Sequence, residues 1–396
     1  MEEQNVMKDF NFVSPTKIYF GANKEQLIGQ ICDERGYKRV YIVIGQGSIK
    51  RNGLLDRVLA SLNSKNVEYQ ILEGVRPNPT IDLCHKGIEE ARKFVPSMIL
   101  AIGGGSVIDT AKNIAVGYFY DGDSFDFNLH KAKPTNALPI GVILTISASG
   151  SELSNSCVIQ DDEKQVKKGF NDDLVRPVFA IENPELTYSV SKVQTAYGIV
   201  DIMMHTLERY FNPSSRDEPA DGFAEVLLRS VVKAAKVVID NPTDYDSRAT
   251  LMLMSSLSHN GLTSIGKDSL LYVHQLEHAV SGLYPEVAHA AGLAVLFPAW
   301  AKYYVTYDTD KFDSLARNVF DLNKESKLEN AKAGIEEIEK LFASLDMPKS
   351  FKDLGIMEPD IKKLVNLITN NGERVIKHPK KDMDEEVLTT ILNSCL

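Results

Sequence analysis

Three histidines within one short segment are the residues of this sequence best suited to chemistry. His274 and His278 are four residues apart in VHQLEHAVSGL, and His289 follows soon after. Asp201 and His205 have the same spacing, which places two side chains on one face of a helix. A lone histidine is usually a packed or surface residue, but three imidazoles with one carboxylate suit Fe²⁺ or Zn²⁺. These residues therefore predict a metal site.

A second chemical feature is the glycine run GGGS at residues 103–106, which joins the strand-like SMILAIG to a helical segment. Glycines allow close backbone approach, and the first N–H groups of a helix have no partner within it. The junction therefore predicts an anion site suited to a pyrophosphate. It matches neither GxGxxG nor GxxxxGK[ST]. Ser106 and Asp109 also have the spacing of a capping box, so Asp109 as a simple helix cap remains an alternative.

The turn GQGSIK at residues 45–50 follows another strand-like run, YIVIG. In many dinucleotide folds a carboxylate after such a strand binds the ribose hydroxyls, and this turn has none. Gly45, Gln46, Ser48 and Lys50 instead offer space, an amide, a hydroxyl and an ammonium group, which favours a ribose 2′-phosphate. The alternative is an ordinary strand-to-helix loop.

The elements that must position these residues differ between the two halves of the chain. Up to about residue 190, continuous apolar runs alternate with amphipathic stretches, which predicts βαβ units around a buried parallel sheet. Beyond it, strand-like runs stop and helical periodicity follows. We predict an α/β dinucleotide-binding domain over residues 1–190 and an all-helical metal and substrate domain over residues 191–396. Strands are expected at residues 40–45, 67–72, 98–103, 140–146 and 178–181.

Composition excludes several classes of protein. The 396 residues suit two or three domains of about 150 residues, and 44 basic against 54 acidic side chains argue against a nucleic-acid binder. The four cysteines form no CxxC pair, which indicates reduced thiols. The first ten residues lack the features of a signal peptide, and no apolar run approaches the roughly 20 residues of a membrane helix. We expect a cytoplasmic protein with neither nucleic acid nor membrane as a partner.

Long motifs spread over nearly the whole chain share their order and spacing with a known family. They are SPTKIYFG (14–21), PNPT (77–80), GGGSVIDTAK (103–112), SASGSELS (147–154), NPELTYSV (183–190), QTAYGIVDIMMHTLERYF (194–211), HQLEHAVSGLY (274–284) and AGLAVLFPAW (291–300). The chain resembles the iron-containing (group III) alcohol dehydrogenases, particularly the butanol dehydrogenase and broad-specificity aldehyde reductase branch. The resemblance weakens beyond about residue 325. It implies the dehydroquinate-synthase-like architecture, in which an α/β dinucleotide-binding domain precedes an all-α metal-binding domain.

The resemblance also implies roles for individual residues. The family's four metal ligands fall on Asp201, His205, His274 and His289, and His278 matches a histidine near the substrate that is considered for proton transfer. A packing role for His278 is the alternative. The resemblance also places the cofactor contacts of the family on residues of this sequence. They are Asn78, Gly104, Gly105, Ser106, Asp109, Thr145, Ser149, Ser151, Ser154, Lys167 and Leu186.

Two departures from the family pattern concern the last ligand. The segment from His278 to His289 is one residue longer than usual, and the customary glycine after the ligand is Ala290. A turn can absorb such an insertion, because loops tolerate changes of length.

The function implied is metal-assisted hydride transfer between NADP(H) and a small alcohol or aldehyde. We expect Fe²⁺ with Zn²⁺ as a substitute, butanal-sized substrates and a homodimer. The apolar helices favour a neutral substrate, because Arg209, the arginine nearest the metal motifs, is expected to face solvent or Glu208. The alternatives are a glycerol dehydrogenase-like polyol oxidase, a dehydroquinate synthase-like lyase, and a nucleotide-binding protein with a structural metal.

Overall fold

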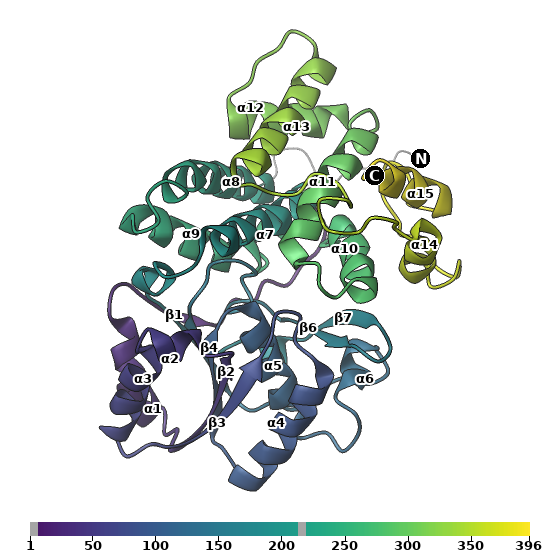
Figure 1. Ribbon diagram of the computed structural model, residues 1–396. Coiled ribbons are helices and arrows are strands. Elements are labelled where there is room, and N and C mark those ends of the chain that lie inside the picture. Colours follow the sequence, from purple (N-terminus) through teal and green to yellow (C-terminus); the bar gives the residue numbers. More distant parts are fainter. Residues whose placement is uncertain (1–6, 213–218) are drawn as a thin grey trace. The chain divides into compact units, whose positions relative to one another are not determined.

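A computed structural model of the chain describes residues 7–212 and 219–396 (Figure 1). The chain forms two compact units that are not continuous in sequence. The sheet unit comprises Val13–Ser191 and Asn241–Asn260, and the helical unit comprises the described residues of Met1–Phe12, Lys192–Asp240 and Gly261–Leu396. The predicted fold class, an α/β part and an all-helical part, is confirmed. The division at residue 190 stays a prediction about where independent domains begin and end.

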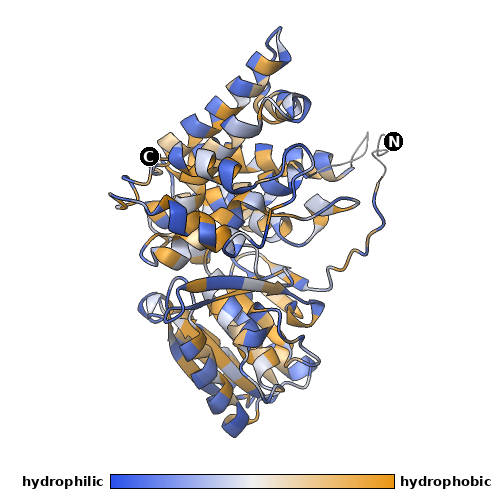
Figure 2. Cartoon of the chain, turned by 90° about the vertical axis from the view of Figure 1, so that its right-hand side faces the viewer, coloured by the Kyte–Doolittle hydropathy of each residue, from blue (hydrophilic) through white to orange (hydrophobic). Residues whose placement is uncertain are grey.

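Six parallel strands form the main sheet of the sheet unit. Their order is β1-β8-β5-β4-β2-β3, and every neighbouring pair is parallel. These strands carry mainly hydrophobic residues, as Figure 2 shows by their orange colour, because helices cover both faces of the sheet. The strands are β1 (Lys17–Phe20), β2 (Arg39–Gly45), β3 (Glu68–Val75), β4 (Met98–Gly103), β5 (Ile140–Leu144) and β8 (Phe179–Glu182).

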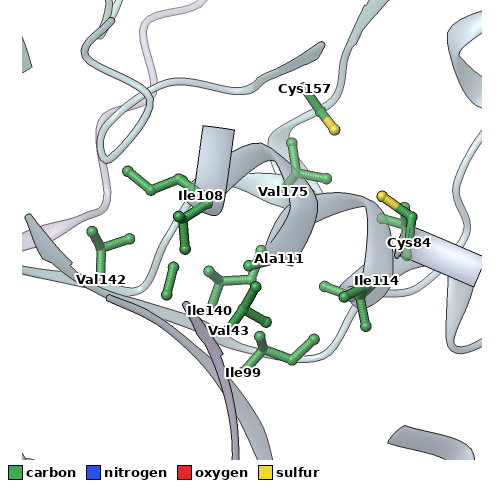
Figure 3. Close-up of a cluster of buried hydrophobic side chains, with 14 of the residues drawn as sticks. Val43, Cys84, Ile99, Ile108, Ala111, Ile114, Ile140, Val142, Cys157 and Val175 are labelled. Carbon is green, nitrogen blue, oxygen red and sulfur yellow. The ribbon is translucent and has the colours of Figure 1, made fainter. Parts of the chain in front are cut away.

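The two faces of the sheet form two separate hydrophobic layers, because successive side chains of a strand point to opposite sides. On one face Val43, Ile99 and Val142 pack with Ala111 and Ile114 of α5 (Figure 3). Burial of each larger aliphatic side chain in this layer stabilises the folded state by about 1.5–3 kcal/mol. Helices α4 (Ile81–Phe94) and α5 (Gly105–Gly117) cover this face, and α1 (Ile28–Glu34), α2 (Ser48–Arg51) and α3 (Leu54–Asn63) lie on the other side (Figure 1).

The structure contains three strands that the sequence did not predict. Strand β1 is a four-residue edge strand whose residues are mostly half-buried, so its apolar run is too short to stand out. Strands β6 (Ser156–Asp161) and β7 (Val166–Asn171) form an antiparallel hairpin beside the short helix α6 (Phe125–Asn128). Lysines interrupt the apolar pattern of β7. All four cysteines are free and buried, and burial raises the pKa of the Cys157 thiol well above its usual range.

The strand order changes direction at β2. The chain goes from β2 to β3 on one side of it and returns to β4 on the other. In open α/β sheets, ligands bind outside the carboxyl ends of the strands at such a switch point. The turns after β2 and β4 both begin at this edge, because the two strands are parallel neighbours.

Helix α9 (Tyr245–Ser258) belongs to the sheet unit although helices of the other unit flank it in sequence. Its carboxyl end is attached to the segment after β5 by polar contacts. The N–H of Ala148 donates to Ser255 Oγ at 3.0 Å, and His259 Nδ1 lies 2.9 Å from the carbonyl oxygen of Ser149. These contacts make α9 part of the support for residues 147–155.

A buried pair of carboxyl groups lies beneath the same helix. Ser256 Oγ is 2.6 Å from Glu152 Oε1 and 2.9 Å from Glu182 Oε1, and both glutamates are almost fully buried. One hydroxyl has a single proton to donate, so only one of these contacts can have serine as its donor. A protonated Glu182 carboxyl can donate the second hydrogen bond to the serine oxygen. Burial, and then the Glu152 carboxylate, raise the pKa of Glu182 well above its ordinary value.

This pair predicts that the protein becomes less stable as the pH rises above about 5. A carboxyl whose pKa is raised in the folded state keeps its proton where the unfolded chain, with a pKa near 4.3, has lost it. Stability therefore falls between that value and the folded pKa, by at most about 1.4 kcal/mol per pH unit for one group. Glu182→Gln should flatten this slope, since the amide can still donate to Ser256. Thermal melting at pH 5 to 9 measures it, with exposed Glu89→Gln as the control. Parallel profiles for Glu182→Gln and the parent protein would contradict the assignment.

The helical unit is built from α-helices and short connections. Its core includes Trp300, which is 1% exposed and stacks on Tyr272 and Tyr304. No helix within residues 7–212 or 219–396 has the length and apolar character that a membrane crossing needs. The α-helices are α7 (Lys192–Tyr210), α8 (Pro219–Val238), α10 (Tyr272–Leu283), α11 (His289–Tyr304), α12 (Thr309–Phe320), α13 (Lys327–Ser344), α14 (Ile361–Thr369) and α15 (Glu385–Asn393).

Candidate active site

The four residues predicted as metal ligands come together in the helical unit. Asp201 and His205 lie one turn apart on α7, His274 lies on α10, and His289 is the first residue of α11. Asp201 Oδ1 is 3.4 Å from His205 Nδ1, 3.8 Å from His274 Nε2 and 3.9 Å from His289 Nε2. Ligand atoms bound at about 2.0–2.2 Å in a tetrahedron are about 3.4 Å apart. The spacing therefore fits Asp201, His205 and His274 around one small cation, since one ligand atom of each lies within 4.8 Å of the others, whereas His289 forms such a group with Glu277 and His278.

The burial of these groups also fits a cation. Asp201, His205 and His274 are only 4–5% exposed, whereas the His289 side chain is 26% exposed. Among the residues that the structure describes, Asp201 Oδ1 and His274 Nε2 are buried polar atoms without a hydrogen-bond partner. Such atoms are rare in proteins and call for an explanation. A divalent ion with nitrogen and oxygen ligands would supply the missing interaction.

Two fully buried glutamates hold the outer sides of two of these imidazoles. Glu208 Oε2 accepts hydrogen bonds from the N–H groups of Val273 at 2.5 Å and His274 at 3.2 Å, and Glu208 Oε1 contacts His274 Nδ1. Glu277 contacts Nδ1 of His289. Each carboxylate thereby directs Nε2 of its histidine toward Asp201. Carboxylates in this position fix the tautomer and orientation of a metal-binding histidine.

The same carboxylates control the charge of His274. Burial alone would lower its pKa, but Glu208 and Asp201 outweigh burial and raise the pKa to about 9. Without a metal, the imidazole is therefore protonated at neutral pH. Metal binding must release that proton, because only the neutral imidazole binds a metal.

The sequence did not single out Glu208 and Glu277. The available signal was an acidic residue within one helical turn of a ligand, since Glu208 is three residues after His205 and Glu277 is three after His274.

The longer segment before His289 does not remove it from the cluster. Helix α10 ends at Leu283 and α11 begins at His289, so residues 284–288 connect the helix that carries His278 to His289. Gly292, one turn into α11, makes room for Glu277: a Cβ there would lie 3.0 Å from Glu277 Cγ. His278 is half-buried, and its ring centre is 5.7 Å from that of His289. It lies beside the ligands, and its role in proton transfer stays a prediction.

Of the two expectations for Arg209, that it faces solvent or Glu208, the solvent one is wrong. Its side chain is buried, and Nη1 donates to the carbonyl oxygen of His205 at 2.7 Å. Burial lowers the pKa of Arg209 to about 10, and the Glu208 carboxylate opposes this shift. The guanidinium therefore supports the backbone of α7 one turn after His205. The sequence pattern could not predict this, because α7 is buried on nearly all sides over its second half.

The sheet unit brings the glycine turn and a serine of the segment after β5 together. Gly104 precedes α5 in an extended conformation, and Gly105 and Ser106 form the first turn. A Cβ on Gly104 would lie 2.3 Å from Ile146 Cγ2, and one on Gly105 would lie 2.4 Å from Ser149 Oγ. Both glycines therefore stand at places of close packing, where a larger residue would displace a neighbouring side chain. The N–H groups of this turn have no partner inside the helix, which suits an anion such as a pyrophosphate.

Asp109 does not cap helix α5. The helix has Gly104 at its amino-terminal cap, with no side-chain hydrogen bond there. Asp109 instead accepts hydrogen bonds from Ser151 Oγ at 2.7 Å and from the N–H of Val158 at 3.1 Å. Burial raises its pKa, although Lys112 and these hydrogen bonds oppose the shift. The capping alternative is therefore wrong, because tertiary partners bind the carboxylate.

The turn after β2 has a carboxylate neighbour on the adjacent strand β3. Lys50 Nζ is 2.6 Å from Glu73 Oε1, on the adjacent strand β3, and both side chains are about half exposed. Gln46 and Ser48 are exposed, and Gly45 is half-buried at the end of β2. The turn therefore has space at Gly45, and the Gln46 amide and the Ser48 hydroxyl are accessible to solvent. Its lysine, Lys50, is ion-paired.

The remaining predicted cofactor residues lie in different environments. The N–H of Thr145 donates to the carbonyl of Gly103 at 3.1 Å, next to the glycine turn. Leu186 is buried in the hydrophobic layer on the α1 and α3 side. Lys167 lies on β7, close enough to Asp109 for its charge to oppose the rise in the pKa of that carboxyl. Asn78 is half-buried, with a positive φ of 54°. Their contacts with a cofactor stay predictions.

Ser151 and Ser154 are buried and turned toward the protein interior. Lys112 Nζ donates to Ser151 Oγ at 2.9 Å and to Ser154 Oγ at 3.2 Å. Their hydroxyls are therefore occupied by a residue that the sequence analysis did not consider. Ser149 is the serine of this segment that lies against the glycine turn.

Family models and known proteins match this chain over nearly its full length. A model described as "Iron-containing alcohol dehydrogenase" matches residues 15–184, and one described as "Fe-containing alcohol dehydrogenase family, C-terminal" matches residues 195–395. NADH-dependent butanol dehydrogenase A of Clostridium acetobutylicum is 40% identical over 384 residues, which cover 96% of this chain and 98% of that relative.

A second relative and a solved structure extend this similarity. NADPH-dependent aldehyde reductase YqhD of Escherichia coli is 30% identical over 369 residues, covering 92% of this chain and 94% of that protein. The crystal structure of NADH-dependent butanol dehydrogenase A from Thermotoga maritima has a TM-score of 0.94 at 35% identity, covering 99% of this chain and 100% of that chain.

Proposed function

Because the chain belongs to the iron-containing alcohol dehydrogenase family, we propose that it transfers hydride between NADP(H) and butanal-sized aldehydes or primary alcohols at an Fe²⁺ centre. The family supports the coarser activity, an alcohol dehydrogenase that acts on small alcohols or aldehydes with a nicotinamide cofactor. The observation that carries the proposal is the placement of three histidine nitrogens within 3.4–3.9 Å of Asp201 Oδ1.

In this mechanism each residue near the cluster has a defined task. Asp201, His205, His274 and His289 would hold the metal, which supplies Lewis acidity toward the substrate oxygen, while the nicotinamide supplies or accepts the hydride. Glu208 and Glu277 keep two of the imidazoles in position. His278 would deliver a proton to the oxygen of the reduced aldehyde, because an imidazole exchanges protons near neutral pH.

The proposed preference for NADP(H) rests on the turn after β2. It has no carboxylate at Gly45, where a dinucleotide fold that selects NAD often has one. NADH is the second candidate, supported by the name of the Clostridium relative and by the ion pair that engages Lys50. A comparison of kcat/KM for NADPH with kcat/KM for NADH, measured with one aldehyde and the same metal, decides between these two candidates. Equal values would remove the proposed preference.

Fe²⁺ is proposed because the ligand set of nitrogen and oxygen atoms suits it, although affinity alone would favour Zn²⁺. Metal analysis after anaerobic purification distinguishes them. We also propose that the enzyme is a cytoplasmic homodimer, which sedimentation and cell fractionation test.

The substrate proposal predicts that aldehyde chain length controls the specificity constant. Each methylene buried in an apolar pocket contributes about 0.8 kcal/mol, or roughly fourfold in kcat/KM. From acetaldehyde to butanal, kcat/KM with NADPH should therefore rise until the pocket is full. A homologous aldehyde series measures this, with glycerol as the comparison substrate. A flat series, or a preference for glycerol, would favour the polyol oxidase alternative, and the absence of any aldehyde-dependent cofactor oxidation would favour a structural metal.

A further inference from the structure

Lys112 is a fully buried lysine of α5 whose ammonium group binds the segment after β5 at five oxygens. Nζ lies 2.7 Å from the Ser151 carbonyl, 3.0 Å from the Ser154 carbonyl and 2.8 Å from the Ser156 carbonyl. It also lies 2.9 Å from Ser151 Oγ and 3.2 Å from Ser154 Oγ. An ammonium group has three N–H donors, so these bonds are shared among five acceptors. One side chain thus determines the path of residues 151–156.

Asp109, one helical turn earlier, completes the attachment. Its carboxylate accepts from Ser151 Oγ and from the N–H of Val158. Ser151 therefore lies between the two charged residues and contacts both. Burial lowers the pKa of Lys112 to about 8, with the Asp109 carboxylate opposing the shift, so the ammonium form remains predominant at neutral pH. Lys112 and Asp109 fix the segment to the middle of the helix whose first turn contains the glycines.

The attached segment reaches the glycine turn through Ser149. The Ser149 side chain lies so close to Gly105 that a Cβ there would be 2.4 Å from Ser149 Oγ, and the serine side chain would have to move. Residues 149–156 and the first turn of α5 therefore form one continuous surface. A displacement of the segment by a fraction of an ångström would alter that surface beside the turn proposed to bind the pyrophosphate.

We infer that Lys112 is a positioning residue for the cofactor: it holds residues 149–156 so that they can contact the nicotinamide half of the dinucleotide bound at the glycine turn. The inference rests on the proposed dinucleotide binding. It assigns Ser151 and Ser154 to the support of the segment, and leaves Ser149 as the serine that faces the turn. Its consequence is selective, because the adenosine half would contact the turn after β2 instead.

The test compares the affinity for NADH with that for ADP-ribose, and the affinity for NADPH with that for 2′-phospho-ADP-ribose, because each analogue has all the phosphates of its cofactor but no nicotinamide. The double variant Lys112→Met/Asp109→Asn removes both buried charges together, because removing one would leave the other uncompensated. For this double variant we expect the dissociation constant of the preferred cofactor to rise about tenfold or more. The constant for the matching analogue should stay within about twofold. Amide hydrogen exchange over residues 147–158 should become faster.

A matched control removes a buried lysine elsewhere. Lys267 of the helical unit is ion-paired with Asp221 at 2.6 Å, and Lys267→Met should lower the melting temperature without changing either dissociation constant. If the double variant fails to fold, Ser151→Ala/Ser154→Ala keeps the three carbonyl contacts of Lys112 and should show the same selective loss to a smaller extent. Equal losses for the cofactor and its matching analogue, or no loss, would overturn the inference. A parent protein that binds neither NADPH nor NADH would overturn the proposed function instead.

Discussion

Replacing His274 with alanine is expected to abolish activity and to lower the amount of bound metal. The change removes one of four ligands and leaves Glu208, a buried carboxylate, without the imidazole that it contacts. Loss of a group that only hydrogen-bonds a metal-binding histidine typically lowers metal affinity about 10–100-fold. Loss of a ligand itself should therefore lower it more. Metal content by elemental analysis and kcat with a saturating aldehyde are the measurements.

Two further variants make this experiment specific. Glu208→Gln keeps all four ligands and should weaken metal binding by about 10–100-fold, between the parent protein and His274→Ala. His85→Ala removes a half-exposed histidine of the sheet unit, which is paired with Asp123, and should change neither measurement. If His274→Ala keeps stoichiometric metal and normal turnover, the assignment of the metal site is wrong.

The second large effect is expected from Gly45→Asp, which should weaken the use of NADPH far more than that of NADH. The new carboxylate would face the 2′-phosphate, and a juxtaposition of like charges can cost several kcal/mol. The fold has room for the added Cβ, which would lie 3.5 Å from the Val75 carbonyl oxygen and 3.8 Å from Val107 Cγ2, both ordinary contacts. The ratio of kcat/KM for NADPH to that for NADH measures the effect.

The matched control is Gly45→Ala, which adds the same Cβ without a charge. It should leave the ratio nearly unchanged. If Gly45→Asp lowers kcat/KM for both cofactors by the same factor, the change has damaged the turn and has not repelled the phosphate. That outcome would contradict a 2′-phosphate near Gly45.

The parts of the fold that could be predicted are those whose signal is local. The run MILAIG predicts β4, because a strand buried on both faces is apolar throughout, and the glycines after it predict the helix start at Gly105. Asp201 and His205 could be paired because one helix carries both. The residue types of Asp201, His205, His274, His278 and His289 already predicted a metal site, and the resemblance to a family then selected Asp201, His205, His274 and His289 as its ligands.

The missed features depend on contacts between distant segments. Glu208 on α7 contacts His274 on α10, 66 residues later, and no pattern within either helix indicates that contact. Asp109 matched a helix cap in sequence but binds Ser151 and Val158, because the segment after β5 packs against it. Arg209 looked solvent-facing from its neighbours, yet α7 is enclosed by other helices. In each case a tertiary partner outweighed the local preference.

The place of α9 in the chain has a consequence for how the protein is made. The sheet unit needs Asn241–Asn260 to be complete, yet about 50 residues of the other unit are synthesised first. At about 5–20 residues per second, a nascent chain that has released Ser191 waits on the order of ten seconds for α9. During that interval the surface later covered by Ser255 and Ser256 is open, and the carboxyl groups of Glu152 and Glu182 are free to ionise. The sheet unit thus reaches its final form only after α7 and α8 have left the ribosome.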